Sequence, residues 1–349
     1  MTSATFDVIV AGAGMVGLYM AAALANAGFS VRLLESGEID AGQPDSPGLR
    51  VSAISHASRR LLMDVGAWRH IPDEKITPYC GMRVWDASAK AFGDRALVFH
   101  SADMGELDLG CIVENRWIQW ALLQELAAND RVAMFDHQAV SDLVVDKGCA
   151  RVFCGDARQH IAQLIIGADG ASSKVRDLLG IEVYRKSYGQ RAVVANIATE
   201  TPHDDTAWQR FLTTGPVAFL PIGERRCSIV WSTSEQEAER LLQTDDRSFE
   251  KELAGASDHV LGAVSLVSKR ASFPLSMQHA ERYVGPCVAL IGDAAHVIHP
   301  LAGQGANLGF GDAGALVAAL KRGRERGDRC GDLRALRQFE RERKHHNRK

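Results

Sequence analysis

The 349-residue sequence lacks the features that mark secreted, membrane-spanning or nucleic-acid-binding proteins. Its seven cysteines form no C-x-x-C pair and no regular spacing, so we expect reduced thiols in a cytoplasmic protein. No apolar run is long enough to span a bilayer, and a first strand predicted to begin by Phe6 leaves no room for a signal peptide. A formal net charge of −3 predicts no attraction to nucleic acid.

Familiar catalytic arrangements of side chains are also missing. The sequence shows no Ser-His-Asp, Cys-His or paired-carboxylate constellation, and no internal repeat. Its 46% hydrophobic and 24% charged residues are ordinary for a globular protein, and its length allows a large core and two joined domains. These absences favour chemistry that belongs to a bound cofactor.

A nucleotide-binding pattern is present in residues 7–17. An apolar run that predicts a buried strand is followed by Gly12, Gly14 and Gly17 in the spacing G-x-G-x-x-G. Gly12 permits a sharp turn, Gly14 lets the backbone approach a pyrophosphate, and Gly17 lets the next helix pack on the strand. That helix, predicted for residues 18–27, would direct free N–H groups at the phosphates.

Glu35 completes the pattern, because it ends a second predicted strand 23 residues after Gly12. An acid at this position can accept both hydroxyls of an adenosine ribose and disfavours a 2′-phosphate. FAD or NAD is therefore expected rather than NADP. The alternative is a glycine-rich turn without a ligand, but the strand, helix, second strand and terminal acid are all in place.

Two more glycine-acid pairs follow apolar strands, at Asp169-Gly170 and Gly292-Asp293. The carboxyl ends of parallel strands meet at one edge of a sheet, which is where open α/β sheets bind ligands. Three converging segments predict a long ligand that lies across the whole edge. Each acid could instead serve only as a helix cap.

The rest of the chain follows three local patterns. Residues 50–62 predict a helix, and residues 132–154 predict a small antiparallel sheet over the nucleotide-binding part. From residue 184 to residue 273, successive strand-like runs and a helical pair predict a second, mostly antiparallel domain.

Two segments resemble a known family. GADGASSKVR (residues 167–176) is similar to the DG motif of flavoprotein aromatic hydroxylases, and GDAAHVIHPLAGQGANLG (residues 292–309) is similar to their second FAD-binding motif. Within that group, GLRVSAIS, VENRWIQ and TTGPVAFLPI resemble the ubiquinone-biosynthesis flavin monooxygenases. The resemblance covers nearly the whole chain. It implies an α/β, para-hydroxybenzoate-hydroxylase-like fold, with a Rossmann-like FAD-binding domain and a second, mostly antiparallel β-sheet substrate domain.

This resemblance sets the expected domain boundaries. The FAD-binding domain is predicted to be discontinuous, over residues 1–75, 101–180 and 275–320, and the substrate domain to cover residues 76–100 and 181–274. Residues 321–349 are predicted to be a basic helical segment, with twelve Lys or Arg and five Asp or Glu. The family usually continues with a further apolar helical segment, so we expect either a truncated chain or a short member.

The resemblance also implies the site residues. The residues expected to bind FAD are Gly12, Gly14, Met15, Val16, Gly17, Glu35, Arg50, Asn115, Asp169, Asp293, Gly303, Gly305, Ala306 and Asn307. Asp293 would accept from a ribityl hydroxyl, and residues 303–307 would present N–H groups near the isoalloxazine, where anionic reduced flavin is favoured. His296 and Pro300 are expected near the flavin. His296 and His299 form H-x-x-H, but without a third ligand no metal is expected.

The expected activity is an FAD-dependent aromatic-ring hydroxylase that uses NAD(P)H and O2, with a polyprenylated phenol of ubiquinone biosynthesis as substrate. One alternative is a flavin monooxygenase of a small soluble aromatic, which should bind a free carboxylate through an arginine of the second domain. Another is a non-catalytic subunit that keeps the fold for assembly. A cytoplasmic protein is expected, with homo-oligomerisation left open. The basic C-terminal helix could contact the inner membrane or a biosynthetic complex, or it could simply be a solvated helix.

Overall fold

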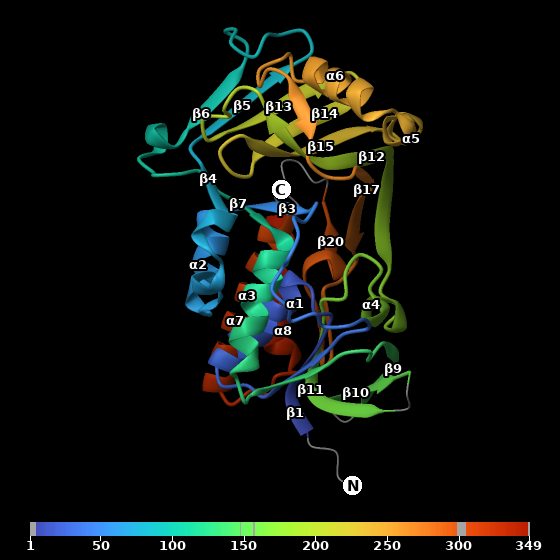
Figure 1. Cartoon of the computed structure of the whole chain (residues 1–349). Coiled ribbons are helices and arrows are strands. Elements are labelled where there is room, and N and C mark those ends of the chain that lie inside the picture. The colour runs from blue at the N-terminus through green and yellow to red at the C-terminus, as the bar shows by residue number, and fades with distance from the viewer. Residues whose placement is uncertain (1–4, 147, 156–157, 299–304, 348–349) are drawn as a thin grey trace.

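Three sheets and the helices around them form the molecule. The structure is a computed structural model, and it describes residues 5–146, 148–155, 158–298 and 305–347. Figure 1 shows one sheet and a group of helices in the lower half, and a second sheet covered by two helices in the upper half. A short third sheet joins the two halves.

The first sheet contains the glycine-acid segments at its strand ends. Its strands are β1 (Thr5–Ala11), β2 (Val31–Leu34), β8 (Val132–Phe135), β9 (Val140–Asp146), β10 (Cys149–Cys154), β11 (Gln159–Gly167), β18 (Val284–Gly285) and β19 (Val288–Leu290). The order is β18-β19-β11-β1-β2-β8, and the strands from β19 to β8 are parallel. Because β1, β11 and β19 are adjacent, their carboxyl ends meet as the sequence predicted.

The helices cover this sheet and the second one. Their bounds are α1 (Met15–Asn26), α2 (His56–Asp64), α3 (Asn115–Ala127), α4 (Lys174–Leu178), α5 (Glu235–Gln243), α6 (Asp246–Ala256), α7 (Gly305–Glu325) and α8 (Leu333–Asn347). Short 3-10 turns are η1 (Ala67–His70), η2 (Asp73–Lys75), η3 (Ser101–Met104) and η4 (Gly292–Ala294). Helix α1 packs on α3 and α7, and α7 packs on α8. The unexposed strand residues Val8, Ile9 and Val10 belong to the same core as these helices.

Two local predictions were wrong. Residues 50–62 were predicted as one helix, but β3 (Val51–Ile54) precedes α2 because its β-branched residues pair with β7 (Gly110–Glu114), and Ser55 caps α2. Residues 132–135 were predicted in a small antiparallel sheet, but β8 extends the first sheet in parallel beside β2. Helix α3 precedes β8 and supplies the crossover that parallel pairing needs. β9 and β10 pair antiparallel as predicted, and β10 also pairs antiparallel with β11 of the first sheet.

The third sheet has the order β3-β7-β4, with β4 at Ile76–Tyr79. The second sheet contains β5 (Gly81–Asp86), β6 (Leu97–His100), β12 (Val183–Thr199), β13 (Thr206–Leu212), β14 (Gly215–Pro221), β15 (Arg226–Ser234), β16 (Val264–Leu266), β17 (Ala271–Ala280) and β20 (His296–Val297). It is mostly antiparallel, as predicted. The domain boundaries remain a prediction, and β20 continues the second sheet into residues assigned to the FAD-binding part.

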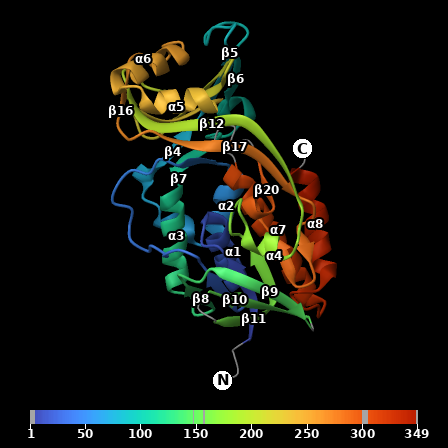
Figure 2. The ribbon, with the colours of Figure 1, turned by 90° about the vertical axis from the view of Figure 1, so that its right-hand side faces the viewer.

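The second sheet has two different faces, because successive side chains alternate along each strand. Ile229, Trp231 and Phe219 are buried in one cluster with residues of α5 and α6. The opposite face, here called the inner face, is turned toward the FAD-binding part, where Ala207 and Leu220 form a cluster with residues of the third sheet. Figure 2 shows β12 and β17 continuing downward from this sheet beside the lower half.

Candidate cofactor site

The glycine turn has the geometry that a pyrophosphate requires. Gly12 has a φ of 105°, and a Cβ there would lie 2.4 Å from the Ala168 carbonyl oxygen. A Cβ at Gly17 would lie 1.9 Å from the Gly12 carbonyl oxygen, so α1 packs on the turn only without a side chain. A Cβ at Gly14 would meet no protein atom within 4 Å, and α1 has no side-chain cap there. The turn therefore leaves space and free N–H groups at the helix start.

Glu35 fixes the shape of this turn. Its Oε2 accepts a hydrogen bond of 2.6 Å from the Ala13 N–H, and its Oε1 accepts from the Gly37 N–H at 3.0 Å. Partial burial alone would raise the pKa of Glu35, but these hydrogen bonds and those of Ser36 outweigh it and hold that pKa below the usual value. The charged carboxylate sits beside the turn, as binding to a ribose would require.

Asp169 lies directly beside the glycine turn and also caps a helix. Its carboxylate accepts from the Ser173 hydroxyl at 2.5 Å and from the Val175 N–H at 3.1 Å. Asp169 therefore acts as a helix cap, and this role does not preclude contact with a cofactor. Its role in binding FAD remains a prediction.

Arg176 joins the second glycine-acid segment to the third, and the sequence analysis did not single it out. Its side chain is fully buried, and its guanidinium donates to the carbonyl oxygens of Ala294 at 3.1 Å and Ala171 at 3.0 Å. The signal available in the sequence was its place inside GADGASSKVR. A buried arginine that holds two carbonyls keeps the turns after β11 and β19 at a fixed separation.

Asp293 lies in η4, after β19, where its side chain reaches solvent although protein atoms surround most of its carboxyl. Desolvation by the surrounding protein raises the pKa of its carboxyl, while His296 and Arg50 lower it. A Cβ at Gly309 would come 2.5 Å from a methyl group of Val16, so the third segment and α7 pack closely on the start of α1. Met15 and Val16 are half-buried there.

Arg50 and Asn115 are neighbours, as a shared site requires. The Asn115 N–H donates to the Arg50 carbonyl oxygen, and the Asn115 side chain accepts from the Ser52 hydroxyl at 2.7 Å. The exposed Arg50 guanidinium lies 5.5 Å from the ring centroid of Phe273, on the second sheet. The Arg50 guanidinium is thus close both to Asp293 and to the second sheet.

The start of α7 contacts β3. Asn307 donates to the Ala53 carbonyl oxygen at 2.7 Å and accepts from the Ser55 N–H at 3.1 Å. Gly305 and Ala306 form the first turn of α7, and both are half-buried. The predicted site residues Pro300 and Gly303 lie outside the described residues.

His296 is tied to a buried ionic network that the sequence analysis missed. Its Nε2 is 2.5 Å from Asp312 Oδ2, and Asp312 Oδ1 accepts from Arg343 Nε at 2.7 Å. Asp312 also accepts from the Gly292 N–H at 3.1 Å and from Asn347. The pKa of Asp312 would be raised by its complete burial, but His296 and Arg343 hold it below the usual value. The network connects α7 and α8 to the turn that carries Asp293.

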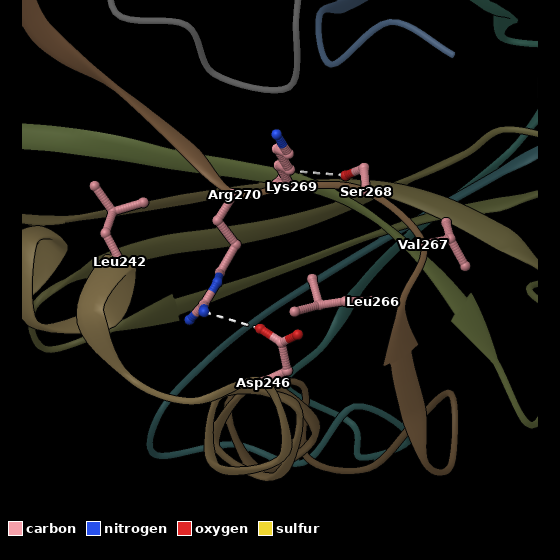
Figure 3. A pocket seen from close by; sticks show the side chains of 7 residues that line it. All are labelled: Leu242, Asp246, Leu266, Val267, Ser268, Lys269 and Arg270. Carbon is pink, nitrogen blue, oxygen red and sulfur yellow. Dashed lines mark hydrogen bonds and ion pairs between the residues drawn. The ribbon is translucent and has the colours of Figure 1, made fainter. Parts of the chain in front are cut away.

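Other possible sites have less support. An open pocket of about 480 Å³ lies where the end of α5 and the start of α6 meet residues 266–270, which precede β17, and Arg270 there donates to Asp246 at 3.0 Å (Figure 3). Arg270 also donates to the Leu241 carbonyl. The pocket is on the side of the sheet away from the glycine-acid segments. Over the described ranges, no group of three potential metal ligands gathers. Among the same residues no helix is long and apolar enough to cross a membrane.

Comparison with known sequences points to the same cofactor. Residues 5–349 match the family model described as "FAD binding domain". The chain is 36% identical over 391 residues to ubiquinone biosynthesis monooxygenase COQ6, mitochondrial, of Danio rerio, covering 98% of this chain and 80% of that protein. It is 35% identical to 3-demethoxyubiquinol 3-hydroxylase of Escherichia coli (strain K12), covering 97% and 86%.

Solved structures show the same fold. The chain superimposes on pqsL, a probable FAD-dependent monooxygenase from Pseudomonas aeruginosa, with a TM-score of 0.81 at 24% identity. The match covers 97% of this chain and 92% of that one. The open space at Gly14, the uncapped start of α1 and the carboxylate of Glu35 beside it are compatible with FAD. The chain therefore belongs to the FAD-binding monooxygenase family that includes the ubiquinone-biosynthesis hydroxylases.

Proposed function

We propose that this FAD-dependent monooxygenase hydroxylates the ring of a polyprenylated phenol in ubiquinone biosynthesis, and that it uses NAD(P)H and O2. The observation that carries the proposal is the convergence of three glycine-acid segments on the side of the molecule toward which the inner face, mostly apolar, is turned. A long nucleotide cofactor fits the edge of the first sheet, and a ring substrate fits between that cofactor and the inner face.

The chain's own residues hold the cofactor and exclude water. The α1 N-terminus would bind the pyrophosphate, Glu35 the adenosine ribose, and Asp293 the ribityl chain. The N–H groups at the start of α7 would favour negative charge on the reduced ring system. FAD supplies the redox chemistry and oxygen transfer. The inner face covers the ring, so that water is kept from the reacting atoms.

The inner face favours a neutral, apolar substrate over an aromatic acid. Three rows of side chains cross the sheet on this face, and none contains Lys or Arg: Asn196, Ser228, Leu220, Ala207 and Met82; Val194, Val230, Ala218, Gln209 and Val84; Ala192, Ser232, Pro216 and Phe211. A free carboxylate buried against these rows would find no cation among their own side chains. A cation beside the third row is the exposed Arg50, which lies over Phe273, the partner of Ala192 on β17. The small-aromatic alternative would need such a cation.

Peripheral contact with an anionic membrane belongs to the same proposal. Arg334, Arg337 and Arg341 are exposed on α8, at spacings that place them along one side of the helix. Arginines close to anionic lipid contribute attraction that salt screens. A second copy of the chain remains a further proposed partner.

One experiment separates these proposals. The protein is mixed with FAD, separated from unbound FAD, and examined by its absorbance spectrum. Oxidation of NADH or NADPH is then followed in the presence of ortho-prenylphenol or of para-hydroxybenzoate. Labelled oxygen from ¹⁸O2 should enter the prenylphenol product. Stimulation by para-hydroxybenzoate alone would support the small-aromatic enzyme. A chain that never binds FAD would favour the non-catalytic subunit.

A further inference from the structure

Gln209 is a buried polar side chain on the inner face. It lies on β13 between Trp208 and Arg210. Trp208 is packed in the cluster beneath α5 and α6, and Arg210 donates to the Gly255 carbonyl at the end of α6. Because side chains alternate along a strand, Gln209 points to the opposite face, as does Ala207 two residues earlier. Gln209 is therefore directed toward the FAD-binding part.

The row that contains Gln209 is otherwise apolar. Gln209 pairs in register with Ala218 on one side and with Val84 on the other, and Val230 and Val194 extend the row. A single amide in a row of small apolar side chains contributes nothing to hydrophobic packing. It is the one group of this row that can form a directional bond.

Contacts on both sides locate this row relative to the cofactor site. In the row on one side, Ala207 clusters with Ala53, whose carbonyl accepts from Asn307 at the start of α7. In the row on the other side, Ala192 pairs with Phe273, and Arg50 lies over that ring. The Gln209 row thus lies between the α7 start and the Arg50 side of the site.

The Gln209 amide has a bonding position that is not used. Its residue is 5% exposed, and its Oε1 is buried without a hydrogen-bond partner among the described residues. Three indole nitrogens, of Trp85, Trp208 and Trp231, are also unpaired, but they belong to the cluster on the other face. Asn196 on the inner face has an unpaired Oδ1, but its Nδ2 donates to the Gly48 carbonyl and so holds the two parts together.

We propose that the Gln209 amide binds the ring hydroxyl of the phenolic substrate and so fixes the position of the ring over the cofactor. The inference rests on the proposed function and adds the residue that selects a phenol. The amide oxygen accepts the phenol O–H, and the apolar neighbours contact the ring and its hydrocarbon substituent. A buried acceptor left unpaired by a ligand without a hydroxyl disfavours that ligand.

The test compares ortho-prenylphenol with prenylbenzene, which differs only in the missing hydroxyl. Each is titrated into the FAD-bound protein, and binding is followed by the change in flavin absorbance. The wild-type chain is expected to bind the phenol about tenfold more tightly. Gln209→Leu is expected to bind both ligands equally, with prenylbenzene affinity unchanged or improved. Gln236→Leu, at an exposed position of α5, is the matched control and should keep the preference for the phenol.

Folding is checked on the same samples. Leucine replaces a buried unpaired amide with an apolar group of similar size, so Gln209→Leu should bind FAD and unfold thermally like the wild type, or at a higher temperature. A Gln209→Leu protein that keeps the preference for the phenol would overturn the role of Gln209 and leave the hydroxylase standing. A wild-type protein that binds both ligands equally would likewise overturn the role of Gln209, whereas the hydroxylase is decided separately by the entry of labelled oxygen into the prenylphenol product.

Discussion

At the level of single residues, Asp293 combines a cost to the folded chain with a role in cofactor binding. Its raised pKa means that the folded chain disfavours the ionised carboxylate more than the unfolded chain does. The penalty therefore appears as the pH rises above the ordinary value of 3.8, and it is complete once the pH exceeds the raised pKa. We therefore expect this residue to lower the free energy of unfolding of the chain without FAD at pH 7, by an amount that its contact with solvent reduces.

Replacement of Asp293 should separate these two effects. Without FAD, Asp293→Asn is expected to be at least as stable as the wild type to urea at pH 7, with the gain vanishing as the pH falls to the ordinary carboxyl pKa. FAD should bind about tenfold more weakly, because a charge-assisted hydrogen bond is lost. The exposed Asp130→Asn is the control for both measurements. A destabilised Asp293→Asn chain at pH 7 would contradict the argument.

The sequence could indicate individual residues where the partner is close in the chain or where the backbone itself is the expected binding group. Gly12, Gly14 and Gly17 could be recognised by spacing. Asp312 and Arg176 could not, since their partners His296, Arg343 and Ala294 are distant or unremarkable in sequence. The signal for Asp312 was a lone acid within the apolar stretch of α7.

The strand–turn–helix element formed by β1 and α1 offers a pair of matched substitutions. A Cβ at Gly17 collides with the Gly12 carbonyl, so Gly17→Ala must shift α1 and should cost about 1–3 kcal/mol of unfolding free energy as well as FAD binding. A Cβ at Gly14 meets no protein atom, so Gly14→Ala should cost less than about 1 kcal/mol but obstruct the pyrophosphate. Urea unfolding and FAD titration of both variants test this difference. An equal loss of stability in the two variants would contradict it.

The link between α7, α8 and η4 depends on the Asp312 carboxylate. In Asp312→Asn, the mostly buried Arg343 loses its counter-charge, which should cost about 3–5 kcal/mol of unfolding free energy. The stabilisation by Asp312 is present above its ordinary pKa of 3.8 and is lost as the pH falls through the depressed pKa of the folded chain.

The control for this link is an ion pair whose arginine, Arg270, is as buried as Arg343 but whose carboxylate is exposed. Asp246 is 73% exposed and pairs with Arg270, so Asp246→Asn should change the unfolding free energy by less than about 1 kcal/mol. Chemical denaturation of the two variants measures both effects. Similar values for Asp312→Asn and Asp246→Asn would show that the buried network contributes no more than a surface pair.

Elements were predictable where the local pattern and the tertiary contacts agree. The strands of the second sheet and the helices α5 and α6 follow their alternation and periodicity. The β3–α2 boundary was missed because the strand depends on pairing with β7, which lies far along the chain. The parallel position of β8 depends likewise on the free edge of β2.

At the scale of the whole molecule, the proposed contact with an anionic membrane can be tested at the exposed arginines of α8. Replacement of Arg334, Arg337 and Arg341 by Gln should weaken binding to vesicles that contain phosphatidylserine, by about 1 kcal/mol for each arginine. Binding to phosphatidylcholine vesicles, measured by co-sedimentation, should not change. Glu342→Gln is the control on the same helix. Equal binding of wild type and triple variant would exclude this surface.

The strand order of the first sheet sets when the cofactor site can exist during synthesis. The ribosome makes β1 first, but its neighbour β11 and the next strand β19 emerge much later, and α7 and α8 follow them. The second sheet can pair earlier, because most of its strands lie between β11 and β19. A cofactor site that needs β1, β11, β19 and the start of α7 together cannot be complete until α7 has been synthesised, so we expect FAD to bind only after most of this chain has been made.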